Sequence, residues 1–428
     1  MPAPDPITLL LAGRYPDPET GALLAAESRA VVIEDTLDGA EAELVAVLDV
    51  GRRVAVVSDR NTHEVLGARV ERALASRFTV QSLVLDAGPR PDAATVERLL
   101  AALAPTTELV IAVGSGTLND LTKLVAFRRG VPQAIFATAP SMNGYTSLSA
   151  SITSDGIKRS FRTRTPLGVF FDLRVLAAAP ARLIRAGLGD SACRPTAQAD
   201  WLLQHMLLDR PYREAPFALL ADDERDVLAD TRALLAGDLT VMRHLVRTLV
   251  LSGFGMTICG GSYPASQGEH LISHYVDMMA PPGLPASLHG EQIAVTTVAM
   301  ARLQEQMLAQ DTPPALRPGR LDRAAIMQHF GPIVGEACWA DVSHKVFDAR
   351  ATEALAARLA RSWDAMRARI GAISVGASAL RKLLADAGAP VEPGDVGWPA
   401  PFFAQAFAHA REIRDRYTFL DLAADSAA

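Results

Sequence analysis

The sequence predicts an α/β domain with a parallel sheet flanked by helices, followed by a mostly helical domain. Over about the first 175 residues, short β-rich segments alternate with helical segments, which is the pattern of a parallel sheet covered by helices. After about residue 180, long segments rich in Ala, Leu and Arg with helical periodicity take over. Because 428 residues exceed what one hydrophobic core usually organises, we expect two domains, over residues 1–180 and 181–428.

Several of the expected strands are near-continuous apolar runs, as found when both faces of a sheet are covered. The strands are expected over residues 30–33, 53–58, 79–85, 109–113, 133–137 and 168–172. Helices are expected between them, over residues 38–48, 64–76, 93–103 and 119–129. In the second part, helical periodicity predicts helices over residues 227–235, 240–251, 291–310, 351–370, 377–386 and 402–423.

The composition is that of an ordinary globular protein, with 49% hydrophobic and 21% charged residues. A formal net charge of −6 gives no general attraction to nucleic acid or anionic lipid. The N-terminal segment has only a short apolar run and no basic leader, and the apolar stretch over residues 245–258 is interrupted by arginine, serine and glycine. We therefore expect a cytoplasmic protein with neither nucleic acid nor membrane as a partner.

The three cysteines, Cys193, Cys259 and Cys338, are widely separated in the sequence. This spacing argues against both a disulfide framework and a zinc-thiolate site. We expect them to be buried as small hydrophobic residues.

The strand expected over residues 109–113 leads into a glycine-rich turn, GSGTLND, at residues 114–120. Such a turn between a strand and a helix lets backbone amides approach a pyrophosphate, while the helix N-terminus supplies positive potential. Two glycines are also what a tight structural turn requires, and Asn119 stands where the G-x-G-x-x-G fingerprint has its third glycine. The turn alone therefore leaves both interpretations open.

Two further segments at strand ends favour a dinucleotide. The strand expected over residues 133–137 leads into TAPSMNGYTS, residues 138–147, whose hydroxyl groups and small side chains can wrap ribose and phosphates. A polar surface loop has a similar composition. Asp59 ends another strand, where its carboxylate can accept hydrogen bonds from adenosine ribose and would repel a ribose phosphate, which favours NAD. Asp59 as the cap of the next helix is an equal alternative.

A cluster of histidines carries the strongest chemical signal. His270 and His274 are four residues apart, so on a helix both imidazoles project from one face. His289 follows after a proline-rich loop, and Asp190 offers a carboxylate near the start of the helical half. An isolated H-x-x-x-H is often accidental, but one Asp with two His forms a site suited to zinc, nickel or ferrous iron.

Taken together, these segments resemble the sn-glycerol-1-phosphate dehydrogenase family, within the larger group of glycerol dehydrogenases, iron-type alcohol dehydrogenases and dehydroquinate synthases. The resemblance covers almost the whole chain in one order, through GSGTLNDLTK, TAPSMNGYTS, FDLRVLAAAPARLIRAGLGD, SQGEHLISH and LHGEQIA. It implies the dehydroquinate synthase-like fold, with a Rossmann-like N-terminal domain, a helical C-terminal domain and an active site in the cleft between them.

The resemblance also implies site residues and ligands. Asp190, His270 and His289 would hold one divalent metal (Zn, Ni or Fe), Asp190 would also touch substrate, and His274 would contact substrate without binding the metal. NAD or NADP would be contacted by Gly114, Gly116, Thr117, Leu118, Asn119, Asp120, Thr138, Ala139, Pro140, Ser141 and Ser147. A homodimer and a role in phospholipid metabolism are further implications of the family.

The implied reaction is reversible reduction of dihydroxyacetone phosphate to sn-glycerol 1-phosphate, with the metal acting as a Lewis acid on the carbonyl oxygen. One position departs from the family pattern, because Asn143 stands where an aspartate usually binds substrate. The amide loses a negative charge and gains two donors, so another polyol or polyol phosphate is the alternative substrate. A sugar-phosphate cyclase and a non-catalytic nucleotide-binding protein are weaker alternatives.

Overall fold

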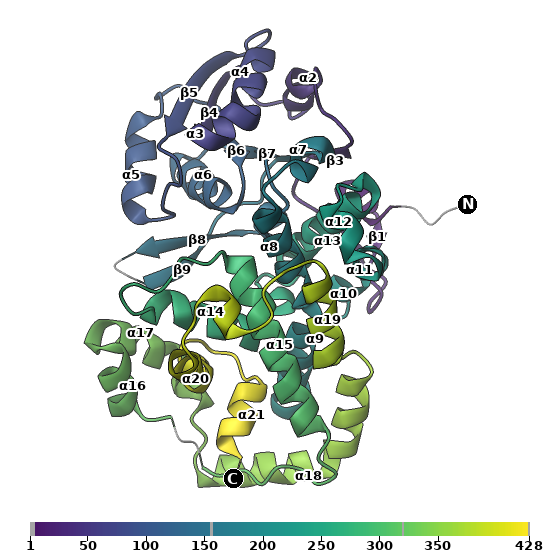
Figure 1. The fold of residues 1–428 in the computed structure, drawn as a ribbon, viewed down its shortest axis with the longest axis vertical. Coiled ribbons are helices and arrows are strands. Elements are labelled where there is room, and N and C mark those ends of the chain that lie inside the picture. The colour runs from purple at the N-terminus through teal and green to yellow at the C-terminus, as the bar shows by residue number, and fades with distance from the viewer. Residues whose placement is uncertain (1–4, 155–156, 319–320, 427–428) are drawn as a thin grey trace. The chain divides into compact units, whose positions relative to one another are not determined.

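A parallel sheet organises the N-terminal part of the chain, as the sequence predicts. The computed structural model describes residues 5–154, 157–318 and 321–426, and within them six strands pair in the order β3-β10-β7-β6-β4-β5 (Figure 1). Every neighbouring pair in this sheet is parallel. The strands are β3 (Ala30–Glu34), β4 (Arg53–Asp59), β5 (Thr79–Leu85), β6 (Leu109–Gly114), β7 (Gln133–Ala137) and β10 (Gly168–Asp172). The predictions of these six strands are confirmed.

Helices cover both faces of this sheet, which explains why β6, β7 and β10 are buried at every position. One hydrophobic cluster joins the sheet to α2 (Glu41–Ala46) and α4 (Ala68–Leu74). The opposite cluster joins it to α5 (Ala93–Ala102) and α6 (Gly116–Arg129). The helix predicted over residues 64–76 begins earlier and is divided, into α3 (Arg60–Thr62), the π-helical turn η1 (His63–Gly67) and α4.

The strand order reverses direction between β4 and β6. From β4 the chain moves outward to β5, then returns to the other side of β4 as β6 and continues to β7 and β10. In open α/β sheets, ligands bind outside the carboxyl ends of the strands at such a switch point. The residues at these two strand ends are Asp59 and Gly114.

Two small antiparallel pairs complete the strands described, and neither was predicted. They are β1 (Tyr15–Pro16) with β2 (Leu23–Leu24), and β8 (Ser149–Ser154) with β9 (Ile157–Arg162). The other helices up to the middle of the chain are α1 (Pro6–Leu11), α7 (Leu173–Ala177) and α8 (Ala181–Ala192).

The structure divides into two units whose boundary differs from the expected division at residue 180. The first unit comprises Met1–Ser191 and Glu214–Ser262, and the second comprises Ala192–Arg213 and Tyr263–Ala428. Residues 214–262 form α10 (Ala215–Ala218), α11 (Ala221–Ala229), α12 (Thr231–Leu235) and α13 (Leu239–Ile258). The apolar sequence of α13 is largely buried, which explains why this helical segment packs with the α/β part. The single helix predicted over residues 227–235 was wrong, because Asp230 interrupts it and caps α12.

The second unit is helical, as predicted. Its core includes Leu203, Tyr275, Trp363 and Phe419. Its helices are α9 (Arg194–Leu208), α14 (Gly268–Met279), α15 (His289–Leu308), α16 (Arg323–Phe330), α17 (Pro332–Val342), α18 (Ala349–Gly371), α19 (Ala377–Asp386), α20 (Ala400–His409) and α21 (Phe419–Asp425). Short turns are η3 (Tyr263–Ala265), η4 (Ser343–Lys345), η5 (Pro393–Val396) and η6 (Ala410–Glu412).

The single helix predicted over residues 402–423 was wrong. The chain leaves the helical path after η6 and resumes it at α21, where Thr418 caps the new helix. The buried ammonium of Lys345 donates to the carbonyls of Arg411 and Arg416 at 2.6 and 3.0 Å. This tertiary contact uses backbone acceptors that a continuous helix would have kept for itself.

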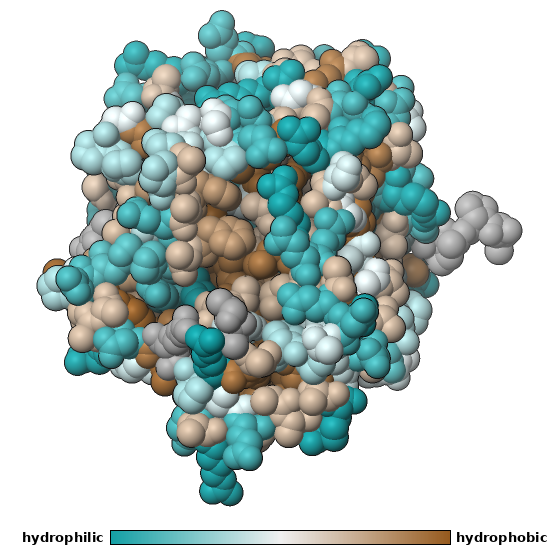
Figure 2. All heavy atoms as spheres, turned by 60° about the horizontal axis from the view of Figure 1, so that its bottom comes forward, coloured by the Kyte–Doolittle hydropathy of each residue, from teal (hydrophilic) through white to brown (hydrophobic). Residues whose placement is uncertain are grey.

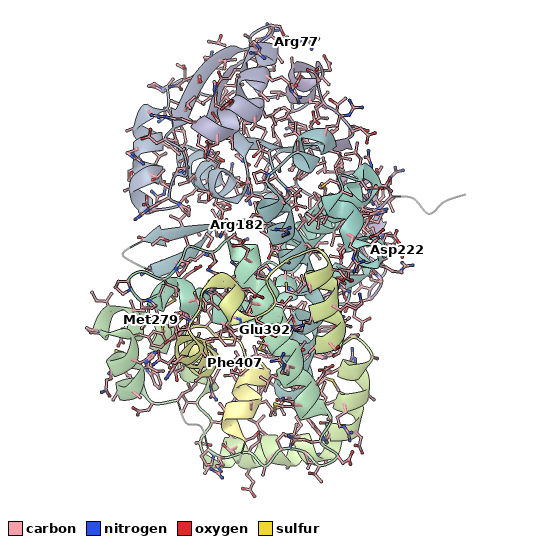
Figure 3. All side chains as sticks on the ribbon, in the orientation of Figure 1. Arg77, Arg182, Asp222, Met279, Glu392 and Phe407 are labelled. Carbon is pink, nitrogen blue, oxygen red and sulfur yellow. The ribbon has the colours of Figure 1, made fainter. Side chains whose placement is uncertain are left out.

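One face of the molecule mixes polar and apolar groups. On the face shown in Figure 2, hydrophilic and hydrophobic residues are interspersed. In the second unit, Met279 and Phe407 pack against the core, whereas Glu392 pairs at the surface with Arg381 at 3.1 Å (Figure 3). None of the helices in the described residues is long and apolar enough to cross a membrane.

The hydrogen bonds of Asp172, at the end of β10, should contribute measurably to the free energy of unfolding. Its carboxylate accepts from Leu37 N at 3.0 Å and from Arg69 Nη2 at 2.7 Å. Burial alone would raise the pKa of Asp172, but these hydrogen bonds and the Arg69 charge outweigh burial, so its pKa is lowered. We expect Asp172→Asn to lower the free energy of unfolding by roughly 2 kcal/mol at pH 7, measured by urea denaturation.

The pH dependence gives the control for this prediction. A lowered folded pKa makes the contribution complete above the unfolded value of about 3.9 and removes it as pH falls through the folded value. The difference between the wild type and Asp172→Asn should therefore shrink below about pH 4. Exposed Asp38→Asn should change stability by less than about 0.5 kcal/mol. Equal effects of the two variants would contradict the role of Asp172.

Candidate active site

The glycine-rich turn joins β6 directly to α6. Gly114 ends the strand, Gly116 begins the helix, and Ser115 lies between them in an extended conformation. A Cβ atom at Gly114 would lie 2.3 Å from Leu118 Cδ1, so glycine here makes room for the Leu118 side chain in the core. The backbone amides at the start of α6 are available to an anion, as in other strand-turn-helix phosphate sites.

Three of the predicted cofactor residues use their side chains inside the protein. Leu118 and Asn119 are buried, and Asn119 Nδ2 donates to the Gly144 carbonyl at 3.4 Å. Asp120 accepts from Ser151 N at 3.0 Å, and burial raises the pKa of the Asp120 carboxyl. A contact of Leu118 or Asn119 with a cofactor would therefore come from the backbone.

The loop over residues 138–147 lies beside the glycine-rich turn. Thr138 N donates to the Gly114 carbonyl at 3.0 Å. Within the loop, Tyr145 Oη donates to the Ala139 carbonyl at 2.5 Å, and Ser147 Oγ donates to the Gly144 carbonyl at 3.0 Å. The two segments that the sequence predicts to line a cofactor site are therefore brought together.

Lys123 holds this loop and was missed by the sequence analysis. The residue is 1% exposed, and its ammonium donates to the carbonyls of Gly144, Ser147 and Ser149 at 2.5, 3.1 and 3.2 Å. Burial lowers the pKa of Lys123 to about 8, against the opposing effect of Asp120. The available signal was a lysine inside the apolar helical run that follows the glycine-rich turn.

The loop also contacts α8, which carries Asp190. A Cβ atom at Gly187 would lie 1.6 Å from the Pro140 carbonyl oxygen, so only glycine allows this approach. Three residues further along α8, Asp190 Oδ2 accepts from Asn143 N at 2.7 Å. The structure thus joins the predicted residues Asn143 and Asp190 through the backbone of position 143.

Asp59, predicted to bind ribose or to cap a helix, caps α3. Its Oδ1 accepts from Thr62 N at 2.8 Å, and Thr62 Oγ1 accepts from Asp59 N, which completes a capping box. The capping alternative is confirmed, and the contact with ribose stays a prediction.

The three predicted histidines converge in the second unit. His270 and His274 lie on α14, and His289 is the first residue of α15. The ring centroid of His270 lies 5.1 Å from that of His289 and 6.1 Å from that of His274. The rings of His274 and His289 are 6.2 Å apart. Such a cluster of imidazoles matches the nitrogen donors of a zinc, nickel or iron site.

Neighbouring side chains determine which ring nitrogens face outward. Glu269 Oε1 lies 2.8 Å from His270 Nδ1, and a carboxylate can only accept, so the neutral ring has its proton on Nδ1 and its lone pair on Nε2. Ser273 Oγ donates to Gln292 Oε1 at 2.5 Å and can therefore only accept from His289 Nδ1, at 3.4 Å. Both rings thus present Nε2, the nitrogen available to a metal.

The sequence analysis missed Glu269, Ser273 and Gln292. The signal for the first two lay in the segment GEHLISH, where polar residues occupy positions of a helix that is otherwise apolar. Asp200 is close enough to Glu269 for their charges to interact. Its carboxylate accepts from Gly268 N at 3.0 Å, at the start of α14. Burial raises the pKa of Asp200 to about 8, and the negative charge of Glu269 adds to this shift.

Cys193 lies next to the histidine cluster. It is 1% exposed, as the sequence predicts, and its sulfur lies within 4.8 Å of ligand atoms of Glu269 and His270. Cys338 is also buried, whereas Cys259 is only partly buried. Among the described residues, all three cysteines are free of disulfides.

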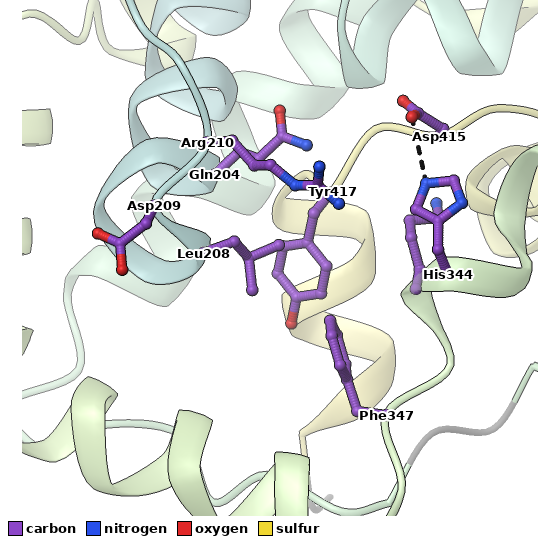
Figure 4. Close-up of a pocket in the computed structure, with 9 residues that line it drawn as sticks. Gln204, Leu208, Asp209, Arg210, His344, Phe347, Asp415 and Tyr417 are labelled. Atoms are coloured by element: carbon purple, nitrogen blue, oxygen red, sulfur yellow. Dashed lines mark ion pairs between the residues drawn. The ribbon is translucent and has the colours of Figure 1, made fainter.

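A separate pocket of about 320 Å³ lies elsewhere in the second unit (Figure 4). Four of its titratable side chains pair within the protein: His344 with Asp415 at 3.1 Å, Asp209 with Arg358, and Lys345 with Asp421. None of the predicted site residues lines it. The lining residues are Gln204, Leu208, Asp209, Arg210, His344, Lys345, Phe347, Asp415 and Tyr417. We assign this pocket no ligand.

The fold of the chain is that of known dehydrogenases, as one family model and two solved structures indicate. Residues 32–180 match the family model of iron-containing alcohol dehydrogenases. The glycerol dehydrogenase of Schizosaccharomyces pombe superposes with a TM-score of 0.62 at 15% identity, over 93% of this chain and 88% of that chain. A probable glycerol dehydrogenase of Sinorhizobium meliloti gives 0.61 at 17% identity, over 92% of each chain. The chain has the fold of these dehydrogenases, as predicted.

Sequence relatives narrow the assignment. The glycerol-1-phosphate dehydrogenase [NAD(P)+] of Bacillus velezensis is 31% identical over 93% of this chain and 93% of its own length. The enzyme of the same name from Pyrococcus furiosus is 36% identical over 58% of this chain and 71% of its own length. The chain therefore belongs to the glycerol-1-phosphate dehydrogenase family, a family of oxidoreductases, and the predicted resemblance is confirmed.

The contact between Gly187 and Pro140 yields the next prediction. Because the obstacle at position 187 is a backbone carbonyl, Gly187→Ala must displace either α8 or the loop over residues 138–147. We expect the free energy of unfolding, measured with urea, to fall by about 3 kcal/mol. Gly371→Ala is the matched control, since a Cβ atom there meets nothing within 4 Å, and it should be neutral or slightly stabilising. A Gly187→Ala variant as stable as Gly371→Ala would contradict the close contact.

Proposed function

We propose that the chain is a metal-dependent, NAD(P)H-linked dehydrogenase that reduces dihydroxyacetone phosphate to sn-glycerol 1-phosphate and catalyses the reverse reaction. The observation that carries this proposal is the histidine cluster, in which His270 and His289 both present Nε2. Membership of the glycerol-1-phosphate dehydrogenase family supports the substrate and the cofactor.

In this proposal Asp190, His270 and His289 hold one divalent metal, and His274 contacts substrate. One carboxylate oxygen and two imidazole nitrogens match zinc, nickel or ferrous iron and leave positions for substrate oxygens. Asp190 belongs to the first unit and the histidines to the second, so their joint binding of a metal is part of the proposal.

Covalent geometry supports including Asp190. Three peptide units separate it from Cys193, so their Cα atoms cannot lie more than about 11 Å apart. Cys193 in turn lies beside His270 within the second unit. The chain itself therefore keeps Asp190 in the neighbourhood of the histidines.

The same proposal assigns the cofactor to the carboxyl edge of the sheet. The amides at Gly116 and Thr117 would face the pyrophosphate at the start of α6. The loop from Thr138 to Ser147 would line the remainder of the dinucleotide, with Lys123 holding its backbone. Asp59 would reach ribose only through the oxygen that does not cap α3.

The residues have distinct tasks in catalysis. A bound divalent cation would supply Lewis-acid stabilisation of the developing alkoxide, and the reduced nicotinamide would supply hydride. Glu269 and Ser273 orient the two imidazoles before substrate arrives, which removes reorganisation from the reaction itself. His274, on the same helix as His270, would exchange a proton with the product hydroxyl directly or through water.

The decisive experiment measures NADH and NADPH oxidation by protein stripped of metal and then reconstituted with Zn²⁺, Ni²⁺ or Fe²⁺. We expect activity with dihydroxyacetone phosphate only after reconstitution. His270→Ala should lose bound metal and at least about 10³-fold in activity, because one ligand of the Lewis acid is gone. Full activity of the stripped wild type would refute the proposal. Gly371→Ala, distant in sequence and open on all sides, controls for preparation.

Asn143 favours a second candidate substrate. The resemblance implies an aspartate at this position, and the amide of Asn143 offers two donors in place of a negative charge. A different polyol or polyol phosphate, with an additional acceptor, would fit this change. Comparing dihydroxyacetone phosphate with dihydroxyacetone and longer ketose phosphates, in the wild type and Asn143→Asp, distinguishes the two substrates.

We further propose a cytoplasmic homodimer. Light scattering after gel filtration would test the oligomeric state.

A further inference from the structure

We propose that Glu269 is a positioning residue that fixes the tautomer and orientation of His270 for metal binding. This inference rests on the proposed metal site. The two side chains are neighbours in the first turn of α14, and both are buried. Glu269 Oε1 lies 2.8 Å from His270 Nδ1 and also accepts from Gln267 N at 2.8 Å.

The carboxylate does two things to the ring. As an acceptor it keeps the proton of the neutral imidazole on Nδ1, so that Nε2 carries the lone pair. As a negative charge it raises the electron density of the imidazole and so strengthens Nε2 as a ligand. The hydrogen bond from Gln267 N holds the same oxygen in place, which restricts rotation of both side chains.

The hydrogen bond that orients His289 is weaker than the one that orients His270. Its Nδ1 lies 3.4 Å from the neutral hydroxyl of Ser273, whose own proton goes to Gln292. A long hydrogen bond to a neutral group contributes less than a short one to a charged group. Glu269 is therefore expected to matter more for metal affinity than Ser273 does.

Folding stability alone does not explain why a buried carboxylate occupies position 269. Its side chain is 0% exposed, and Oε2 accepts no hydrogen bond from the described residues. Asp200 places a second acidic group nearby, and the buried Arg416 offers a compensating charge. A buried carboxylate with an unused oxygen costs free energy, and its hydrogen bonds with His270 and Gln267 N are the contacts that offset this cost.

The test compares Zn²⁺ affinity and thermal stability in the full-length chain. Glu269→Gln retains the shape and one acceptor oxygen but removes the charge. We expect its dissociation constant for Zn²⁺, measured by competition with a chromophoric chelator, to rise 10- to 100-fold. The melting temperature of the metal-free variant should stay within about 4 °C of the wild type, since Oε2 has no hydrogen bond to lose. Ser273→Ala should weaken Zn²⁺ binding less than Glu269→Gln does.

Asp200→Asn is the matched control, because it removes a neighbouring buried carboxylate whose hydrogen bonds go to Gly268 N, Phe419 N and Gln304 instead of to an imidazole. Its Zn²⁺ affinity should stay within about threefold of the wild type. An equal loss in both variants, or none in Glu269→Gln, would overturn the role of Glu269. Equal Zn²⁺ binding by the wild type and His270→Ala would instead reject the proposed metal site.

Discussion

The close approach of α8 to the loop over residues 138–147 is the constraint on which the first unit depends. Because the Pro140 carbonyl occupies the place of a side chain at Gly187, the loop backbone lies directly on the helix. From there Asp190 reaches Asn143 N, and on the other side Thr146 Oγ1 donates to the Val250 carbonyl of α13 at 2.7 Å. Because contacts with two helices hold the loop, it needs little regular structure of its own. Its backbone lines the carboxyl edge of the sheet.

Lys123 shows how the same loop satisfies its polar groups. The carbonyls of Gly144, Ser147 and Ser149 in and after this loop all face the Lys123 ammonium. Without a donor, these buried carbonyls would lower the free energy of unfolding. An ammonium is the side-chain group that offers three donors in a tetrahedral arrangement. Burial opposes the charge, as the lowered pKa of about 8 indicates, but an apolar residue here would leave several acceptors unpaired.

The sequence allowed prediction of whatever depended on local patterns. The six parallel strands follow from apolar runs bounded by turns, and the three histidines follow from helical spacing and proximity in the chain. Contacts between distant segments left no such pattern. Lys345 breaks the helix predicted over residues 402–423 from about seventy residues away, and α13 joins the α/β unit because of the surface it buries. Glu269 was adjacent to a predicted ligand, yet its role depends on a rotamer that the sequence does not specify.

Position 143 separates the framework of the site from its specificity. The hydrogen bond to Asp190 comes from the backbone N–H of Asn143, so any residue other than proline can make it. A change of the side chain leaves the close contacts of the loop in place, because the loop meets α8 at Gly187 and α13 at Gly253. A Cβ atom at Gly253 would lie 2.1 Å from Thr146 Oγ1 and 2.9 Å from the Asn143 carbonyl oxygen. An aspartate at this position would add a negative charge and could keep the same backbone contact. In the proposed function, a substitution at position 143 would therefore change the charge presented to the substrate without changing the backbone contact with α8.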